Sequence, residues 1–225
     1  MTDKLPLFPG PSSPAAPARP SRGRPKDLDK RAAILKAAKI RFLKKGLIGT
    51  SMEAIAADAG VSKLTLYSHF RNKDELFRQT VTTKCREHTP DALFDIHDGA
   101  PLRERLLRIG QGFVDLINSA DATNLYRMMA AQGGRVNKLG RLFWEAGPER
   151  TMHEFSRLLA AAAAAGELEI GEPRRAAAHF FILLKGEAHL KHLVGAGAPP
   201  TPTARQRHVR DVVEVFLRAY SPKPR

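Results

Sequence analysis

The sequence predicts an all-α fold of about nine helices, divided into a small N-terminal part built on three helices and a larger helical part. Apolar residues recur at helical spacing through most of the chain. Residues 50–77 have the pattern of two short helices around a tight turn, followed by the start of another helix. The chain has 225 residues, of which 43% are hydrophobic, and this supplies enough apolar surface for a substantial core.

The chain begins with 21 residues that are rich in Pro, Ala and Ser, and we expect them to form a disordered tail. A basic run, Ser21 to Lys26, follows, and its Gly and Pro favour an extended chain. Such a run either lies as a solvated linker or places Arg22 and Arg24 in a narrow minor groove. The first helix is expected from about Leu28 to Lys45, where Gly46 ends it.

The helix-turn-helix pattern itself begins with an apolar stripe at Met52, Ile55, Ala56 and Ala59. Gly60 can adopt the positive φ that a sharp turn after this helix requires, and Ser62 is a suitable N-cap for the next helix. In that helix the apolar residues four apart are expected to face inward and the polar ones outward. The inward pair is Leu66 and Phe70, and the outward set is Lys63, Thr65, Tyr67 and His69. Such outward side chains suit the major groove of DNA.

A fourth helix is expected from about Asn72 to His88. Asn72 and Glu75 form a variant of the capping box, and Lys73 stands at the electropositive end, well placed for a phosphate. The dipeptide Thr89-Pro90 breaks the pattern. We therefore predict a DNA-binding domain over 22–88 that includes the basic arm, a second domain over 89–220, and a short disordered tail over 221–225.

The second domain is expected to be helical throughout. Helices are predicted from Pro101, from Asp121 or Thr123, over about 137–165, and over two final segments, 173–194 and 203–220. A break or kink is expected at Gly147-Pro148. The two final helices carry much apolar surface, which belongs either to the core or to a subunit interface. We favour a two-fold homodimer through this pair of helices, because helix-turn-helix proteins gain affinity by binding two half-sites.

The charge is unevenly distributed. The net charge is +14, and residues 1–90 hold 18 Lys and Arg against 8 Asp and Glu, so the part that faces a polyanion is N-terminal. The single cysteine, Cys85, excludes an internal disulfide, fits a reducing cytoplasm and is expected to pack in a helix. No apolar run approaches the roughly 18 residues that a bilayer span requires, so a membrane partner is not expected.

Residues 31–77 closely resemble the DNA-binding domain of TetR/AcrR-family transcriptional regulators. The resemblance rests on Ile34 to Ala38, Phe42, Gly46, Thr50 to Met52, Ile55-Ala56, Ala59 to Lys63, Thr65 to Phe70 and Asn72-Lys73. It implies a homodimer of nine or ten helices per chain whose C-terminal domain binds a small effector. The usual action of such a protein is repression that the effector relieves.

The resemblance also implies roles for individual residues. Thr50 or Ser51 would touch phosphate, and Lys73 would do the same at the start of the next helix. Lys63, Thr65, Tyr67 and His69 would meet bases or phosphates. Leu64 departs from the small residue that is commoner at its position. A leucine there either contacts a thymine methyl or packs, so the base preference of the family does not carry over.

The C-terminal half is similar to AefR-like domains from Phe143 to Leu168. Bulky side chains are the candidates to line an effector cavity, with core packing as the alternative for each of them: Phe113, Tyr126, Met129, Trp144 and Phe181. Trp144 is the strongest candidate, because the kink beside it would interrupt helix packing and leave room for a small, largely apolar effector.

Glu187, His189 and His192 lie within about one helical turn, which is a weak metal signal, and we expect surface or dimer-interface histidines instead. No phosphate-binding loop, nucleophile elbow or HExxH motif is present in the sequence. We therefore expect no catalytic residues, metal or cofactor. The predicted function is that of a cytoplasmic, ligand-responsive repressor, which a small-molecule effector releases from a palindromic operator. The alternatives are an architectural DNA-binding protein without an effector and, less favoured, a helical enzyme.

Overall fold

The computed structural model describes residues 24–97, 99–131 and 137–222, and the side chains from residue 28 onward within these ranges. These residues form an all-helical fold with no strand among them, as predicted. The first four helices and a short 3-10 helix are α1 (Arg24–Lys45), α2 (Met52–Asp58), α3 (Lys63–His69), α4 (Lys73–His88) and η1 (Asp91–Phe94). The others are α5 (Leu102–Ile117), α6 (Ala120–Ala130), α7 (Lys138–Ala146), α8 (Pro148–Ala164), α9 (Pro173–Leu193) and α10 (Pro202–Tyr220).

The helix α1 begins four residues earlier than expected, at Arg24 rather than Leu28. Pro25 is compatible with this start, because the first turn of a helix has no use for the missing N–H. The expectation of an extended run is therefore wrong for residues 24–26. Arg22 and the predicted N-terminal tail lie outside the described residues, as do residues 223–225 of the predicted C-terminal tail.

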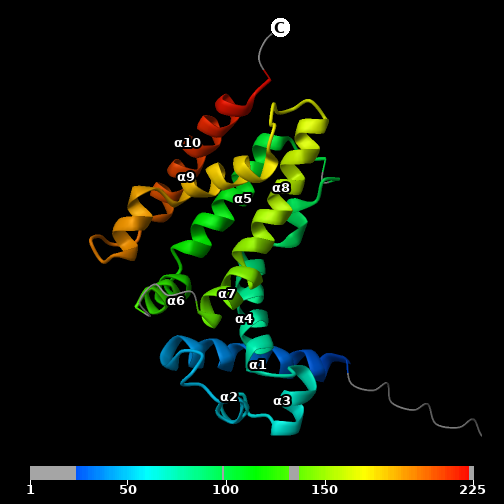
Figure 1. Ribbon diagram of the computed structural model, residues 1–225, viewed down its shortest axis with the longest axis vertical. Helices are drawn as coiled ribbons and strands as arrows, with labels where there is room; N and C mark the ends of the chain where they lie inside the picture. Colours follow the sequence, from blue (N-terminus) through cyan, green and yellow to red (C-terminus); the bar gives the residue numbers. More distant parts are fainter. Residues whose placement is uncertain (1–23, 98, 132–136, 223–225) are drawn as a thin grey trace, which may run out of the picture.

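The turn between α2 and α3 has the geometry that the sequence predicts. Gly60 has a φ of +65°, and the N–H of Val61 donates to the carbonyl of Ala56 at 3.1 Å. Ser62 caps α3 by accepting a hydrogen bond from the Thr65 N–H at 3.1 Å. Figure 1 shows α2 and α3 at the end of the molecule opposite to α10.

The helix α4 connects the two ends of the molecule (Figure 1). Asn72 accepts a hydrogen bond from the Glu75 N–H at 2.9 Å, and Glu75 reaches back to the Arg71 N–H at 2.8 Å, which confirms the capping-box variant. Along α4, Phe77 packs edge-on against Phe42 of α1, with ring centroids 5.3 Å apart. The same helix also contacts α5 and α7, so it belongs to both halves of the fold.

Two cores stabilise the chain. The N-terminal core is made by α1 to α4, and it also includes Leu139, Leu142 and Ala146 from α7. The C-terminal core is built from η1, α5, α8, α9 and α10 around Phe155, Phe180 and other buried apolar side chains. The N-terminal core therefore draws on residues that lie about 50 positions beyond the end of α4.

The predicted break at Gly147-Pro148 is present and separates α7 from α8, so the segment expected as one kinked helix forms two. The helix α6 begins at Ala120, one to three residues earlier than expected, because Ser119 provides the N-cap. An interruption that the sequence analysis did not anticipate lies at Gly186, where φ is 60° and ψ is 174° within α9.

One of the two histidines for which a surface or dimer-interface position was expected is buried within the chain. His189 is not on the surface: it is 6% exposed, and its Nδ1 lies 3.2 Å from Asn118 Oδ1. His192 Nε2 lies 3.5 Å from Thr123 Oγ1, so both side chains face polar groups near the start of α6. The described residues contain no group of three His, Cys, Asp or Glu side chains with metal-binding geometry. Within the same residues, no helix is both long enough and apolar enough to span a membrane.

Candidate functional site

The exposed face of α3 is rotated slightly from the predicted one. Leu66 and Phe70 are buried, as expected from their spacing, and Lys63 and Tyr67 face solvent. Thr65 and His69 are only half-exposed, whereas Leu64 is 82% exposed and Ser68 is also on the surface. Ser68 was not predicted on this face, and Leu64, for which a base contact and packing were both open, lies on it. Their spacing of four, with Leu64 next to Lys63, was the available signal.

Two polar contacts hold the start of α3. Thr65 Oγ1 lies 2.9 Å from Ser62 Oγ, which turns the Thr65 hydroxyl toward the cap. Lys63 Nζ lies 2.8 Å from Glu53 Oε1 on α2. Their hydrogen bond raises the pKa of Lys63 and lowers that of Glu53. Both groups are solvent-exposed, so Lys63 can exchange Glu53 for a phosphate at little cost.

The residues before α2 divide into an internal and an external group. Thr50 is 2% exposed, and its hydroxyl donates to the Gly46 carbonyl at 2.7 Å, so this hydroxyl stabilises the corner after α1. Ser51 is exposed and caps α2 through the Ala54 N–H at 3.2 Å. Lys73 Nζ donates to the Thr50 carbonyl at 2.8 Å and lines the same open groove as Ser51. This geometry argues against a phosphate contact by the Thr50 side chain and leaves Ser51 and Lys73.

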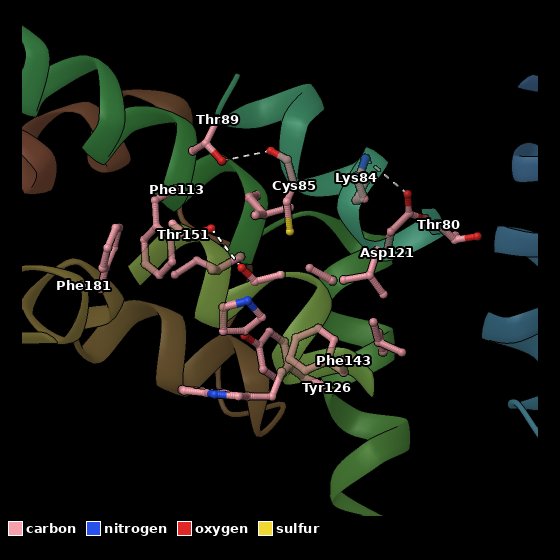
Figure 2. Close-up of a pocket in the computed structure, with 18 of the residues that line it drawn as sticks. Thr80, Lys84, Cys85, Thr89, Phe113, Asp121, Tyr126, Phe143, Thr151 and Phe181 are labelled. Atoms are coloured by element: carbon pink, nitrogen blue, oxygen red, sulfur yellow. Dashed lines mark hydrogen bonds and ion pairs between the residues drawn. The ribbon is translucent and has the colours of Figure 1, made fainter. Parts of the chain in front are cut away.

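A cavity of about 350 Å³ lies where α1 and α4 meet α5 to α9 (Figure 2). Four of the five predicted side chains line it: Phe113, Tyr126, Trp144 and Phe181. Met129 does not line it, and its side chain packs against the N-terminal core. Residues of α1, Lys39, Phe42 and Leu43, also line the cavity, and no sequence signal indicated them.

Trp144 lies at the edge of this cavity with 52% of its surface exposed, and its Nε1 donates to Glu149 Oε2 at 3.1 Å. The Gly147-Pro148 kink was expected to interrupt the packing of the helices beside Trp144. In the structure, this corner packs closely against α4. A β-carbon on Gly147 would lie 3.0 Å from Cys85 Sγ and 3.1 Å from Val81 Cγ1. The glycine therefore lets the α7–α8 corner approach α4 closely, while Gly147 and Pro148 still form part of the cavity wall.

Polar groups are few on the cavity wall, and most are already engaged. The hydroxyls of Thr80, Thr89 and Thr151 each donate to a carbonyl four residues earlier. Burial raises the pKa of the Cys85 thiol to about 11, against the opposing charge of Arg150, so the thiol is neutral at pH 7. An inert, buried cysteine is consistent with the packing role expected for it.

An ion-pair cluster lies at one side of the cavity. Asp121 Oδ2 on α6 is 3.0 Å from Lys39 Nζ on α1 and 3.4 Å from Lys84 Nζ on α4. Burial alone would raise the pKa of Asp121, but the hydrogen bond from Lys39 and the charges of both lysines outweigh it and lower the pKa. The cluster therefore joins the helix-turn-helix part to α6 with an ionised carboxylate.

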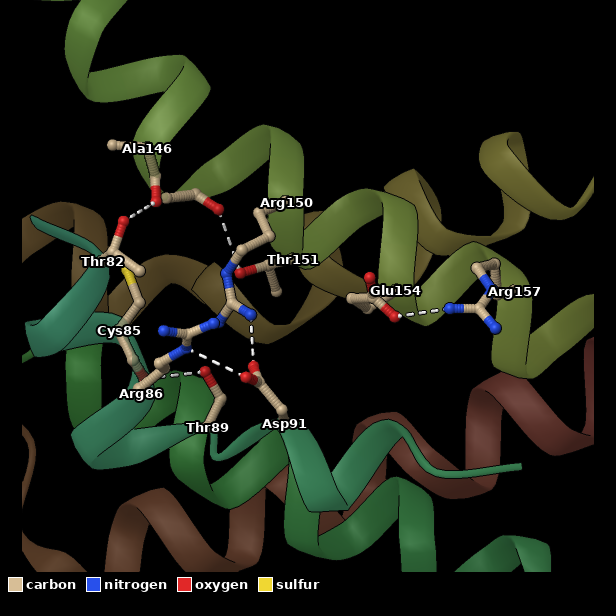
Figure 3. A network of polar contacts seen from close by, with 11 residues as sticks. Thr82, Cys85, Arg86, Thr89, Asp91, Ala146, Arg150, Thr151, Glu154 and Arg157 are labelled. Atoms are coloured by element: carbon tan, nitrogen blue, oxygen red, sulfur yellow. Dashed lines mark hydrogen bonds and ion pairs between the residues drawn. The ribbon is translucent and has the colours of Figure 1, made fainter. Parts of the chain in front are cut away.

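A second polar network joins α4 to η1, α7 and α8 (Figure 3). Asp91 of η1 pairs with Arg86 of α4 at 2.9 Å and with Arg150 of α8. Thr82 donates to the Ala146 carbonyl at 2.9 Å beside it. These contacts hold the C-terminal half of α4 against the α7–α8 corner, so α4 and α8 are fixed to each other on this side of the cavity.

Comparison with known proteins identifies both halves. Residues 34–80 match the family described as "Bacterial regulatory proteins, tetR family", and residues 104–222, just over half of the chain, match "AefR-like transcriptional repressor, C-terminal domain". The chain belongs to the TetR family. It is a TetR-family transcriptional regulator with an AefR-like C-terminal domain, and regulators of this family bind DNA and form dimers.

Solved TetR-family structures share this fold over nearly their whole length. The structure of the flavonoid-responsive regulator FrrA is 33% identical, covers 87% of this chain and 98% of its own, and has a TM-score of 0.66. A TetR-family regulator from Mesorhizobium loti MAFF303099 is 26% identical, covers 88% and 99%, and has a TM-score of 0.70.

Curated relatives that are named as HTH-type regulators match over shorter segments. The transcriptional regulator YhgD of Bacillus subtilis is 35% identical over 81 residues, which are 36% of this chain and 42% of YhgD. The transcriptional repressor ComR of Escherichia coli is 45% identical over 58 residues, 26% of this chain and 27% of ComR. The chain thus spans less than half the length of these two relatives.

Proposed function

We propose that this TetR-family regulator is a homodimeric repressor that leaves a palindromic operator when a small molecule occupies the cavity between its two halves. One observation carries the proposal. The cavity wall combines Lys39 and Phe42 of α1, Phe77 and Val81 of α4, and side chains of α5 to α9. An occupant therefore touches both the helix-turn-helix part and the C-terminal helices.

On the DNA side, the exposed face of α3 is the groove-reading surface. Lys63, Leu64, Tyr67 and Ser68 face solvent there, with Thr65 and His69 at its margin. A leucine is suited to the methyl group of thymine, and the polar groups are suited to base edges and phosphates. Ser51 and Lys73 are proposed phosphate contacts. Arg22 is a proposed minor-groove contact on the strength of sequence alone, and Arg24, which begins α1 and is not in an extended arm, is proposed as a DNA contact on the same basis.

The proposed dimer forms through α9 and α10. Apolar side chains are exposed in this region. They include Leu183 and Leu190 on α9, Val194 just after α9, and Val215 on α10. A two-fold dimer presents two copies of α3 to half-sites about 34–36 Å apart, which multiplies affinity for a palindrome. A protein that acts on chromosomal DNA in this way works in the cytoplasm.

Linkage relates the two sites. An effector that favours a dimer whose two α3 helices no longer match the half-sites weakens operator binding by the same factor by which the operator weakens effector binding. A coupling of about 1–3 kcal/mol is enough for a useful switch. The helix α4 transmits the change, because it begins beside the phosphate-facing groove at Lys73 and ends on the cavity wall at Cys85.

The cavity favours a largely apolar effector with an aromatic or extended body. Phe113 and Phe181 face each other with ring centroids 4.7 Å apart, and Tyr126 lies edge-on to Phe143 at 5.5 Å. FrrA, a relative at 33% identity, is described as flavonoid-responsive. That description supports a small organic effector for this chain too.

Selection of bound DNA from a random pool tests the proposal. We expect a palindrome that binds at least about 10³-fold more tightly than random DNA, and a sequence-independent architectural binder would not show this ratio. The selected palindrome is then titrated in the presence of compounds that bind the cavity. If compounds that fill the cavity leave operator affinity unchanged, the induction part of the proposal is wrong.

A further inference from the structure

We propose that the effector is an amphipathic acid, whose apolar body fills the aromatic part of the cavity and whose anion binds Lys39 and Lys84 in competition with Asp121. This inference rests on the proposed function, because it concerns the same cavity. It adds the chemical class of the effector and the ion pair that the effector replaces.

The charges of the cavity wall favour an anion. Three lysines line the cavity, Lys39, Lys84 and Lys185, against a single carboxylate, Asp121. One oxygen of Asp121 serves both Lys39 and Lys84, at 3.0 and 3.4 Å. Lys84 also reaches Glu87 at 3.2 Å, on the more exposed side of α4. No carboxylate of the described residues lies within ion-pair distance of Lys185.

The hydrogen-bond donors of the cavity wall also favour an anionic ligand. The threonine hydrogens are engaged by backbone carbonyls, and the indole N–H of Trp144 is engaged by Glu149. Tyr126 also lines the cavity, and burial raises the pKa of its hydroxyl, which therefore keeps its proton at pH 7. The donors left for a ligand are therefore the lysines and the Tyr126 hydroxyl, and a carboxylate accepts hydrogen bonds from both kinds of group.

The polar and apolar parts of the wall are separated. Figure 2 shows Lys84 and Asp121 on one side of the cavity, with Phe113 and Phe181 on the opposite side. A molecule with one acidic end and one apolar end matches this arrangement. A neutral apolar molecule would leave the lysine side unused, and a cationic one would meet the two ammonium groups that hold Asp121.

Replacing the Asp121 ion pair would alter the contact between the two halves. Lys39 belongs to α1, and Asp121 belongs to α6. The other end of α6 is held to the end of α9, since Arg127 donates to the carbonyls of Leu193 and His192 at 2.9 and 2.6 Å. An anion that takes Lys39 and Lys84 from Asp121 therefore removes an ion pair between α1 and a helix anchored in the proposed dimer region.

The test compares three probes of equal length and different charge: decanoate, decan-1-ol and decylamine. Binding to the full chain is measured by calorimetry and by the emission of Trp144, the one tryptophan of the sequence, which lies at the edge of the cavity. We expect decanoate to bind about tenfold or more tightly than decanol, the factor typical of a charge-assisted hydrogen bond, and decylamine to bind most weakly.

Three variants locate the charge that is recognised. Lys84→Met is expected to remove most of the preference for decanoate, while decanol affinity stays the same. Asp121→Asn is expected to raise decanoate affinity severalfold, because the competing carboxylate is gone. Lys36→Met is the control, since Lys36 is an exposed lysine of α1 that does not line the cavity. Thermal unfolding of each variant verifies that it is folded.

Equal binding of decanoate and decanol, or no binding of either, would overturn the proposal, as would a charge preference that survives Lys84→Met. Operator release separates this inference from the proposed function. Release by decanol as effective as release by decanoate rejects the acid and keeps the ligand-responsive repressor. Tight decanoate binding without release from the selected palindrome keeps the acid-binding site and rejects induction.

Discussion

The imidazole of His208 fills the space beside Gly186, where α9 is interrupted. A β-carbon on Gly186 would lie 2.8 Å from both Cε1 and Nε2 of His208. The same Nε2 lies 3.1 Å from the carbonyl oxygens of Leu183 and Leu184, just before the interruption. The His208 side chain of α10 thus stabilises the interrupted backbone of α9.

Gly186→Ala is expected to destabilise the protein by roughly 2–3 kcal/mol, because alanine disfavours a φ of 60° and its methyl group displaces His208 from the two carbonyls. Urea denaturation measures the change. Gly195→Ala is the control: its φ is 79°, but no atom lies within 4 Å of the added carbon, so only backbone strain applies. In the His208→Ala background the cost of Gly186→Ala should fall, and strict additivity would contradict this explanation.

Thr50→Val is expected to lower the free energy of unfolding by about 1–2 kcal/mol, because the buried hydroxyl donates to the Gly46 carbonyl and valine leaves that carbonyl unsatisfied. Thr203→Val, at an exposed position of α10, makes the same chemical change without burial. The two variants are compared by urea denaturation. Equal stabilities would mean that the Thr50 hydroxyl is not part of the corner and is free for another role.

Leu64→Ala is expected to change the base preference of the protein at one position of the half-site, at a cost of about 1–3 kcal/mol for the preferred base. Lys73→Ala is expected to weaken binding to every sequence and to reduce the salt slope by about one. Affinity for the selected palindrome and for its single-base variants, at several salt concentrations, distinguishes the two effects. A uniform loss for Leu64→Ala would show that this side chain packs against the DNA backbone.

The Asp121 cluster predicts a pH dependence of stability. The pKa of Asp121 is lowered in the folded state, so its contribution is fully present above the unfolded value of about 3.9 and is lost as the pH falls through the folded value. Because Asp121 is partly exposed, we expect a contribution of about 1 kcal/mol or less. Unfolding of the wild type and of Asp121→Asn should therefore converge in acid. Glu167→Gln, an exposed change, serves as the reference, and a gap between wild type and Asp121→Asn that is constant from pH 7 to pH 3 would contradict the prediction.

Local patterns were enough to predict the helices and most of their ends. The i, i+4 pair Leu66 and Phe70 correctly gave the inward face of α3, and Gly60 and Pro148 correctly marked two corners. The outward face was less exact, because the cap formed by Ser62 turns Thr65 inward in a helix of only seven residues. The sequence contains the capping residue, but not the orientation that the packing of α3 imposes.

The cavity was predictable only in part, for a different reason. Bulky aromatic side chains such as Phe113 and Phe181 identify themselves by type, but Lys39 and Asp121 are 82 residues apart and meet only through the packing of α1 on α6. The kink at Gly186 likewise depends on His208, on the next helix. A single sequence carries no local trace of such pairings.

The contribution of α7 to the N-terminal core limits how this protein can be recombined. Leu139, Leu142 and Ala146 cover an apolar surface of α4 that a fragment ending at His88 would expose to water. A chimera that grafts this DNA-reading head onto another sensor must therefore supply matching apolar side chains where α7 packs. The same requirement restricts which sensor domains could have been exchanged with this head during the divergence of such regulators.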